Sequence, residues 1–167
     1  MAQEIINRVA NSKLITVDLE DYYPEGKRIL LDIKDWLYEG FVLREKEFRA
    51  IVKDHDWSEY QNTYVALTCS SDAIIPAWAY MLLTTMLNPY TKRVVVGDLE
   101  TLETVIYQDI ISVLDISQYK DKYLIIKGCS EKPVPQNAYI LLTAKLTSVA
   151  KSVMYGEACS SVPLFKR

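Results

Sequence analysis

The feature that most constrains the fold is an internal repeat. Residues 56–98 recur as residues 115–157, with matching residues 59 positions apart. The identical pairs include Tyr60 and Tyr119, Tyr64 and Tyr123, Pro76 and Pro135, Tyr80 and Tyr139, and Gly97 and Gly156. So many matches at one offset exceed what chance gives, and we predict an internal duplication.

Each copy of the repeat has the pattern of a strand, a helix and a second strand. The first strands are predicted at 65–68 and 124–127, where β-prone runs are too short for helices. Pro76 and Pro135 follow these strands, at positions where the first turn of a helix tolerates proline. The apolar segments after them, 78–87 and 139–146, are predicted to be buried helices. The second strands, 93–96 and 152–155, each end at a glycine.

The rest of the chain continues this alternation. We predict a strand at 28–37, helices at 41–53 and 99–114, and a short helix at 2–10. Alternating strands and helices favour an α/β fold with one mainly parallel sheet of about five strands and helices on both faces. Because no linker divides the sequence, we predict a single domain over residues 1–167.

Composition excludes several classes of protein. The 167 residues carry a net charge of −3 without a cluster of Lys or Arg, so we expect no nucleic-acid partner. The apolar runs are shorter than the roughly 20 residues of a membrane span, and the first residues do not resemble a secretory signal. Three cysteines, an odd number, favour reduced thiols and a cytoplasmic location.

The cysteines are the candidate site, because ligands of open α/β sheets bind beyond the carboxyl ends of the strands. Cys69, Cys129 and Cys159 each lie in a turn after a predicted strand, and serine follows each of them. Three thiolates and a fourth ligand form a common tetrahedral metal set, so we predict zinc or iron as a candidate cofactor. The candidate metal ligands are Cys69, Cys129, Cys159, Asp72, Glu157 and His55.

Two other interpretations of the cysteines stay open, and so does the question of whether the protein is an enzyme. The sequence has no Cys-x-x-Cys pair, and free cysteines often only pack in a core, as in a non-catalytic scaffold or oligomer. Alternatively, Cys69 or Cys129 is a nucleophile whose thiolate is favoured by a following helix end. The apolar tail 160–165 is expected to dock on the body or on a second subunit, which makes a homodimer a candidate assembly.

Five stretches carry a resemblance to a known family: Asp18–Asp21, Asp32–Leu37, Ala66–Asp72, Lys127–Ser130 and Gly156–Ser160. Over nearly the whole chain the sequence resembles a family of uncharacterised bacterial proteins, defined only as a domain of unknown function. The resemblance implies a bacterial cytoplasmic protein and assigns no activity to any residue.

Overall fold

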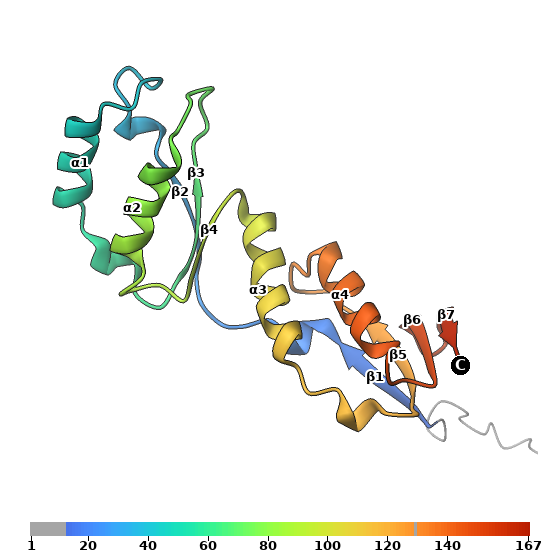
Figure 1. The fold of residues 1–167 in the computed structure, drawn as a ribbon. Helices are drawn as coiled ribbons and strands as arrows, with labels where there is room; N and C mark the ends of the chain where they lie inside the picture. The colour runs from blue at the N-terminus through green and yellow to red at the C-terminus, as the bar shows by residue number, and fades with distance from the viewer. Residues whose placement is uncertain (1–12, 129) are drawn as a thin grey trace, which may run out of the picture. The chain divides into compact units, whose positions relative to one another are not determined.

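The computed structural model describes residues 13–128 and 130–167 (Figure 1). The strands are β1 (Leu14–Asp18), β2 (Arg28–Asp32), β3 (Tyr64–Thr68), β4 (Arg93–Val96), β5 (Tyr123–Lys127), β6 (Ser152–Glu157) and β7 (Ser160–Lys166). The α-helices are α1 (Glu45–Asp54), α2 (Ala77–Leu87), α3 (Leu99–Val113) and α4 (Gln136–Leu146). The helix predicted at 2–10 lies outside the described residues. No described helix has the length and apolar character needed to cross a membrane.

The predicted mixed α/β fold with mostly parallel strands is confirmed, but the prediction of one five-stranded sheet is wrong. The strands form two sheets, in the orders β1-β5-β6-β7 and β2-β3-β4. All neighbours are parallel except β6 and β7. The sheet divides because β5 pairs with β1 rather than with β4, and the polar, mixed sequence before residue 24 gave no expectation of a strand at β1.

Contacts separate the chain into two compact units. The continuous unit is Pro24–Ile106, and the split unit combines the described residues up to Tyr23 with Tyr107–Arg167. The boundary falls within α3. The prediction of a single domain over residues 1–167 stays a prediction.

In the continuous unit, one face of the β2-β3-β4 sheet is covered by α1 and α2. Val65 and Leu67, two positions apart on β3, lie in one buried cluster with Phe48 of α1 and Leu83 of α2. Alternate residues of a strand point to opposite faces, so this face is the core. Both helices are therefore held by burial of apolar side chains against the same strand.

The opposite face of this sheet holds a buried ion pair. Arg28, at the start of β2, pairs with Glu103 of α3, with 2.6 Å between Nε and Oε1. The two side chains are only 10% and 7% exposed. The Arg28 guanidinium also donates to the carbonyl oxygens of Pro24 and Gly26 and lies 4.8 Å from the centre of the Tyr64 ring. The pair thus attaches the first part of α3 and the 24–26 turn to β2.

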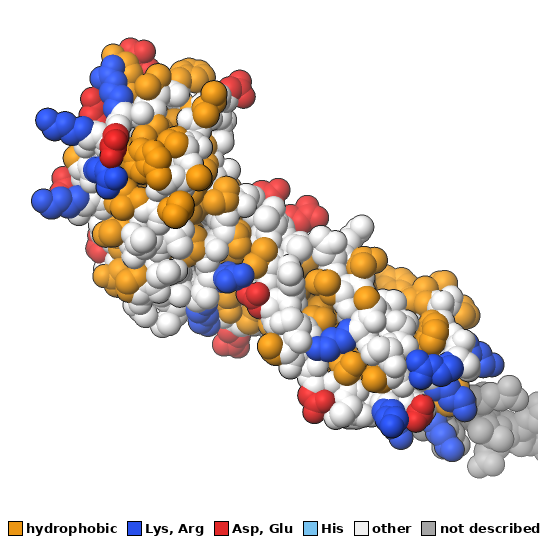
Figure 2. Space-filling view, in the orientation of Figure 1, with side chains coloured by type: hydrophobic (Ala, Val, Ile, Leu, Met, Phe, Trp, Pro, Cys, Tyr) orange, Lys and Arg blue, Asp and Glu red, His pale blue; other side chains and the backbone are white. Residues whose placement is uncertain are grey.

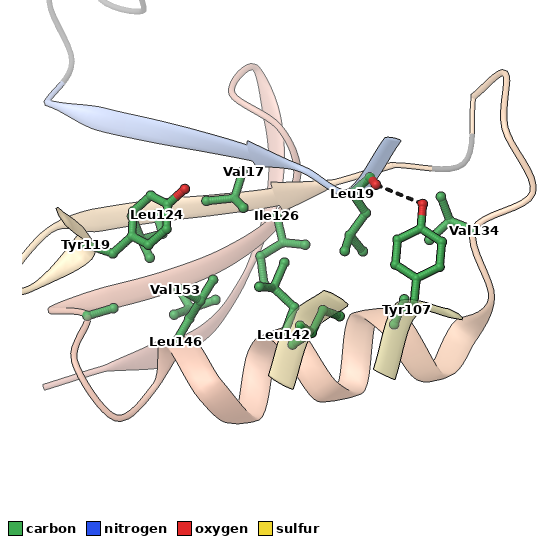
Figure 3. Packing of buried hydrophobic residues seen from close by; sticks show 13 residues of the cluster. Val17, Leu19, Tyr107, Tyr119, Leu124, Ile126, Val134, Leu142, Leu146 and Val153 are labelled. Carbon is green, nitrogen blue, oxygen red and sulfur yellow. Dashed lines mark hydrogen bonds between the residues drawn. The ribbon is translucent and has the colours of Figure 1, made fainter. Parts of the chain in front are cut away.

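In the split unit, α4 and the end of α3 cover one face of the β1-β5-β6-β7 sheet (Figure 3). Leu124 and Ile126 of β5 lie in a buried cluster with Leu142 and Leu146 of α4. Tyr107 of α3 joins the cluster, and its hydroxyl donates to the carbonyl oxygen of Leu19 at 2.9 Å. That hydrogen bond satisfies the phenol where its ring is fully buried.

The tail docks on the body of its own chain, as one of the predicted options. It forms β7, which pairs antiparallel with β6 from Glu157↔Ser160 to Ser152↔Lys166. Ala158 and Cys159 form the two-residue turn of this hairpin. Gly156 has a positive φ of 115° there, a conformation that suits glycine.

Candidate functional site

The predicted metal ligands are distributed between the two units. Cys69, Asp72 and His55 lie in the continuous unit, and Glu157 and Cys159 lie in the split unit. Cys129 lies outside the described residues, so a shared three-cysteine site stays a prediction. Among the residues that the structure describes, no group of three His, Cys, Asp or Glu side chains could hold a metal ion.

The two described cysteines have different surroundings. Cys69 follows β3 directly and is half-buried, with its Sγ 3.3 Å from the Ser71 hydroxyl oxygen. Helix α2 begins only at Ala77, so the seven residues 70–76 separate this thiol from the helix. Cys159 is exposed in the hairpin turn. At the constant offset of the repeat, Cys69 lies at the position of Gly128 rather than of Cys129.

His55 and the candidate carboxylates also have local roles. His55 Nε2 is 3.0 Å from the Tyr60 hydroxyl, and its ring packs against Trp36 and Trp57. Burial raises the pKa of Tyr60, with a smaller contribution from the charge of Glu59. The histidine is therefore part of an aromatic cluster at the end of α1.

Each unit has a carboxylate, at the end of the first strand of its sheet or just after it, that binds the turn following the neighbouring strand. Asp32 accepts from the N–H groups of Ser70 and Lys34, and its hydrogen bonds, first with the Ser70 side chain, lower its pKa. In the split unit, Glu20 accepts from the N–H groups of Glu131 and Ser130, and these bonds lower its pKa, the Glu131 bond most. These carboxylates fix the strand-end turns.

Three strands of the split unit end in a charged cluster. Lys127 of β5 has its Nζ 3.5 Å from a carboxylate oxygen of Asp18 and 3.6 Å from one of Glu157. The two carboxylates, Glu157 first, raise the pKa of Lys127. Glu157 is thus an ion-pair partner of the lysine in this structure.

The split unit has an apolar groove on its surface, which we call the α4 groove. It has a volume of about 740 Å³ and lies between α4 and the β6–β7 hairpin. Its lining residues are Ile126, Val134, Gln136, Tyr139, Ile140, Thr143, Ala144, Tyr155 and Leu164. Figure 2 shows hydrophobic side chains gathered over α4 and this hairpin.

The floor and walls of the α4 groove come from different layers. Ile126 and Val134 belong to the buried core and form its base. Ile140, Leu164 and Tyr155 are 67%, 52% and 46% exposed and form its sides. Sequence reasoning missed this groove, although it did identify the apolar tail that became β7. The sequence signal for an uncovered apolar surface was that the segment forming α4 is apolar on more sides than one sheet can cover.

These features define an α/β protein made of two small units with mostly parallel sheets, with an open apolar groove beside the strand ends of one unit. The chain belongs to the family described as protein of unknown function (DUF2480), whose model matches residues 3–167. This family agrees with the resemblance noted from the sequence. No curated protein matches the chain, and neither does any solved structure.

Proposed function

We propose that the protein is a non-catalytic binding protein that holds an amphipathic helix of a polypeptide partner in the α4 groove. The observation that carries this proposal is the exposed apolar lining. Large contiguous apolar surfaces on a soluble protein mark sites of interaction, because leaving them in water is unfavourable. A volume of about 740 Å³ is in the range of sites that enclose a specific ligand.

The chemistry of the lining favours a helix face over a charged metabolite. None of the nine lining side chains is charged, and their polar groups are the Gln136 amide and the hydroxyls of Tyr139, Thr143 and Tyr155. A site for a carboxylate or phosphate would need cationic groups or free backbone N–H groups aimed at it. An uncharged groove beside a helix suits the apolar stripe of another helix.

The fluorescent dye 8-anilinonaphthalene-1-sulfonate tests the groove, because its apolar rings can enter the groove while its sulfonate stays in water. The full chain is expected to bind it, and Ile140→Glu is expected to weaken binding about tenfold, because a carboxylate would enter an apolar site. Val113→Glu is the matched control, since Val113 is 83% exposed in the same unit but does not line the groove. Equal dye binding by both variants and the parent chain would contradict the proposal.

A designed Leu/Lys peptide of about 14 residues, four helical turns long, tests the class of partner. It should displace the dye from the parent chain, whereas a peptide of the same composition with its helical periodicity scrambled should not. Equal displacement by both peptides would show that the groove does not select a helix.

We also infer that residues 56–98 and 115–157 arose by duplication. The order of elements supports this inference: a 3-10 turn, a strand, an α-helix and a strand follow one another in both segments. The helices α2 and α4 both begin after a proline, at Ala77 and Gln136. An experimental structure in which residues 64–96 fail to superpose on residues 123–155 would refute it.

A further inference from the structure

The sheet of the split unit gathers a row of cations at one end. One lysine comes directly before each of β1, β5 and β6, and the register of these strands places their first residues side by side. Lys166 of β7 pairs with the first residue of β6, so the row extends over three strand spacings, about 14 Å. The exposed cations of this row, which we call the basic end, are Lys13, Lys122, Lys151, Lys166 and Arg167.

Backbone hydrogen bonds hold this row in place. The Lys151 amide donates to the carbonyl oxygen of Lys122 at 2.8 Å, and the Arg167 amide donates to that of Lys151 at 2.9 Å. Figure 2 shows Lys and Arg side chains gathered near the C-terminus that Figure 1 marks. Asp115 and Asp121 lie in the segment that leads into β5, but in the described part of the chain the exposed cations of this end outnumber them. The basic end therefore keeps an excess of positive charge.

The basic end adjoins the α4 groove. Thr143 and Ala144, which line the groove, lie in the last turn of α4. Just beyond this turn, the carbonyl oxygens of Thr147 and Ser148 accept from the Arg167 guanidinium, each at 3.3 Å. The step from Ala144 to Thr147 is about 5 Å along a helix axis. A helix lying in the groove along α4 therefore has one of its ends beside exposed cations.

The opposite end of the groove has an excess of carboxylates. Gln136, in the first turn of α4, and Tyr155, near the end of β6, line this part. The described charged groups where β1, β5 and β6 end, and in the turns that follow, include the carboxylates Asp18, Glu20, Glu131 and Glu157 and the lysines Lys127 and Lys132. Two of these carboxylates already share Lys127. We call this the acidic end.

We propose that the partner helix carries segregated charges, acidic in the half that lies at the basic end and basic in the half that lies at the acidic end. This inference rests on the proposed function and names the kind of helix that the α4 groove takes. The apolar lining supplies the contact area, whereas the charges at the two ends fix the direction of the helix along α4. A helix bound the other way round would place like charges together at both ends.

Two peptides of the same composition test this proposal. Both carry the same Leu stripe, but one has all its Glu in the N-terminal half and all its Lys in the C-terminal half, whereas the other alternates Glu and Lys. Both are neutral, so the net charge of the protein cannot favour either. At an ionic strength of about 0.1 M, where charges act over about 10 Å, the segregated peptide should bind the full chain about tenfold more tightly by isothermal titration calorimetry. At about 1 M salt this preference should disappear.

Substitutions in the basic end locate the effect. Lys151→Gln with Lys166→Gln should reduce the preference for the segregated peptide to about twofold, because two of the cations that face its acidic half are gone. Lys46→Gln with Lys53→Gln removes the same charge from exposed positions of α1, in the continuous unit, and should leave the preference unchanged. Circular dichroism checks that every variant keeps its fold and that the two peptides are equally helical.

The outcomes separate this inference from the proposed function. If Ile140→Glu leaves the binding of both peptides unchanged, both proposals fail. If Ile140→Glu weakens both peptides but the parent chain binds the two equally, the groove is a helix site and the charge segregation is wrong. Equal binding of the peptides, together with binding of a single-stranded oligonucleotide that Lys151→Gln with Lys166→Gln abolishes, would assign the basic end to a nucleic acid and overturn the proposal.

Discussion

A single arginine joins three segments of the continuous unit. Arg28 is bound by Glu103 through two of its nitrogens and by two carbonyl oxygens of the 24–26 turn. Lysine could not replace it, because only the planar guanidinium presents several donors in fixed directions. The ion pair is buried, so its two charges depend on each other.

Glu103→Gln is therefore expected to destabilise the protein by about 3 kcal/mol, because it removes the buried negative charge that the Arg28 guanidinium binds. Urea unfolding monitored by circular dichroism measures the loss. Glu45→Gln is the control: it breaks the exposed Glu45–Arg49 pair and should cost at most about 0.5 kcal/mol. A similar small loss for Glu103→Gln would show that the buried pair is not important for stability.

At the scale of elements, the β6–β7 hairpin forms one wall of the α4 groove. A Cβ added at Gly156 would lie 2.7 Å from the carbonyl oxygen of Ser160, on a backbone that already has a positive φ. Gly156→Ala should therefore disturb the hairpin turn, with a strain of about 1–3 kcal/mol.

Hydrogen exchange tests this prediction through the amides of β7, which should exchange faster in Gly156→Ala. Gly40→Ala is the comparison, since Gly40 also has a positive φ but an added Cβ would lie 3.8 Å from its nearest neighbour. Unchanged exchange across β7 would mean that the turn tolerates the methyl group.

The helices could be predicted from the sequence, because their signals are local. The apolar run after Pro76 gave 78–87, and α2 is Ala77–Leu87. Strand partners could not be predicted, because the choice of β1 over β4 as the neighbour of β5 depends on contacts distant in sequence. The position of the α4 groove could not be predicted either, because the sequence of a helix that is apolar on most sides does not show which side its neighbours leave uncovered.

At the scale of the whole molecule, five carboxylates in the described part of the chain should make stability fall in acid. The residues whose pKa is lowered by hydrogen bonds to turn or capping groups are Glu20, Asp32, Asp56, Asp98 and Asp115. A lowered folded-state pKa contributes stability above the ordinary values of 4.5 for Glu and 3.8 for Asp. That stability is lost as pH falls through the lowered pKa.

Thermal unfolding should thus show a nearly constant Tm above about pH 5 and a falling Tm between about pH 4 and pH 2. Asp32→Asn should lower the Tm at neutral pH and make the decline in acid shallower, because one of the titrating groups is gone. A Tm that stays flat down to the acid end of this range would contradict the pKa shifts.

The split unit also has a consequence for synthesis of the chain. Asp18 of β1 pairs with Lys127 of β5, 109 positions later, while all of Pro24–Ile106 lies between them. At about 5–20 residues per second, β1 leaves the ribosome about 5–20 s before its partner strand exists. During that time the continuous unit can fold, but residues 14–18 present two unpaired edges to other nascent chains. We therefore expect slower translation of residues 107–127 to lower the amount of protein recovered in soluble form.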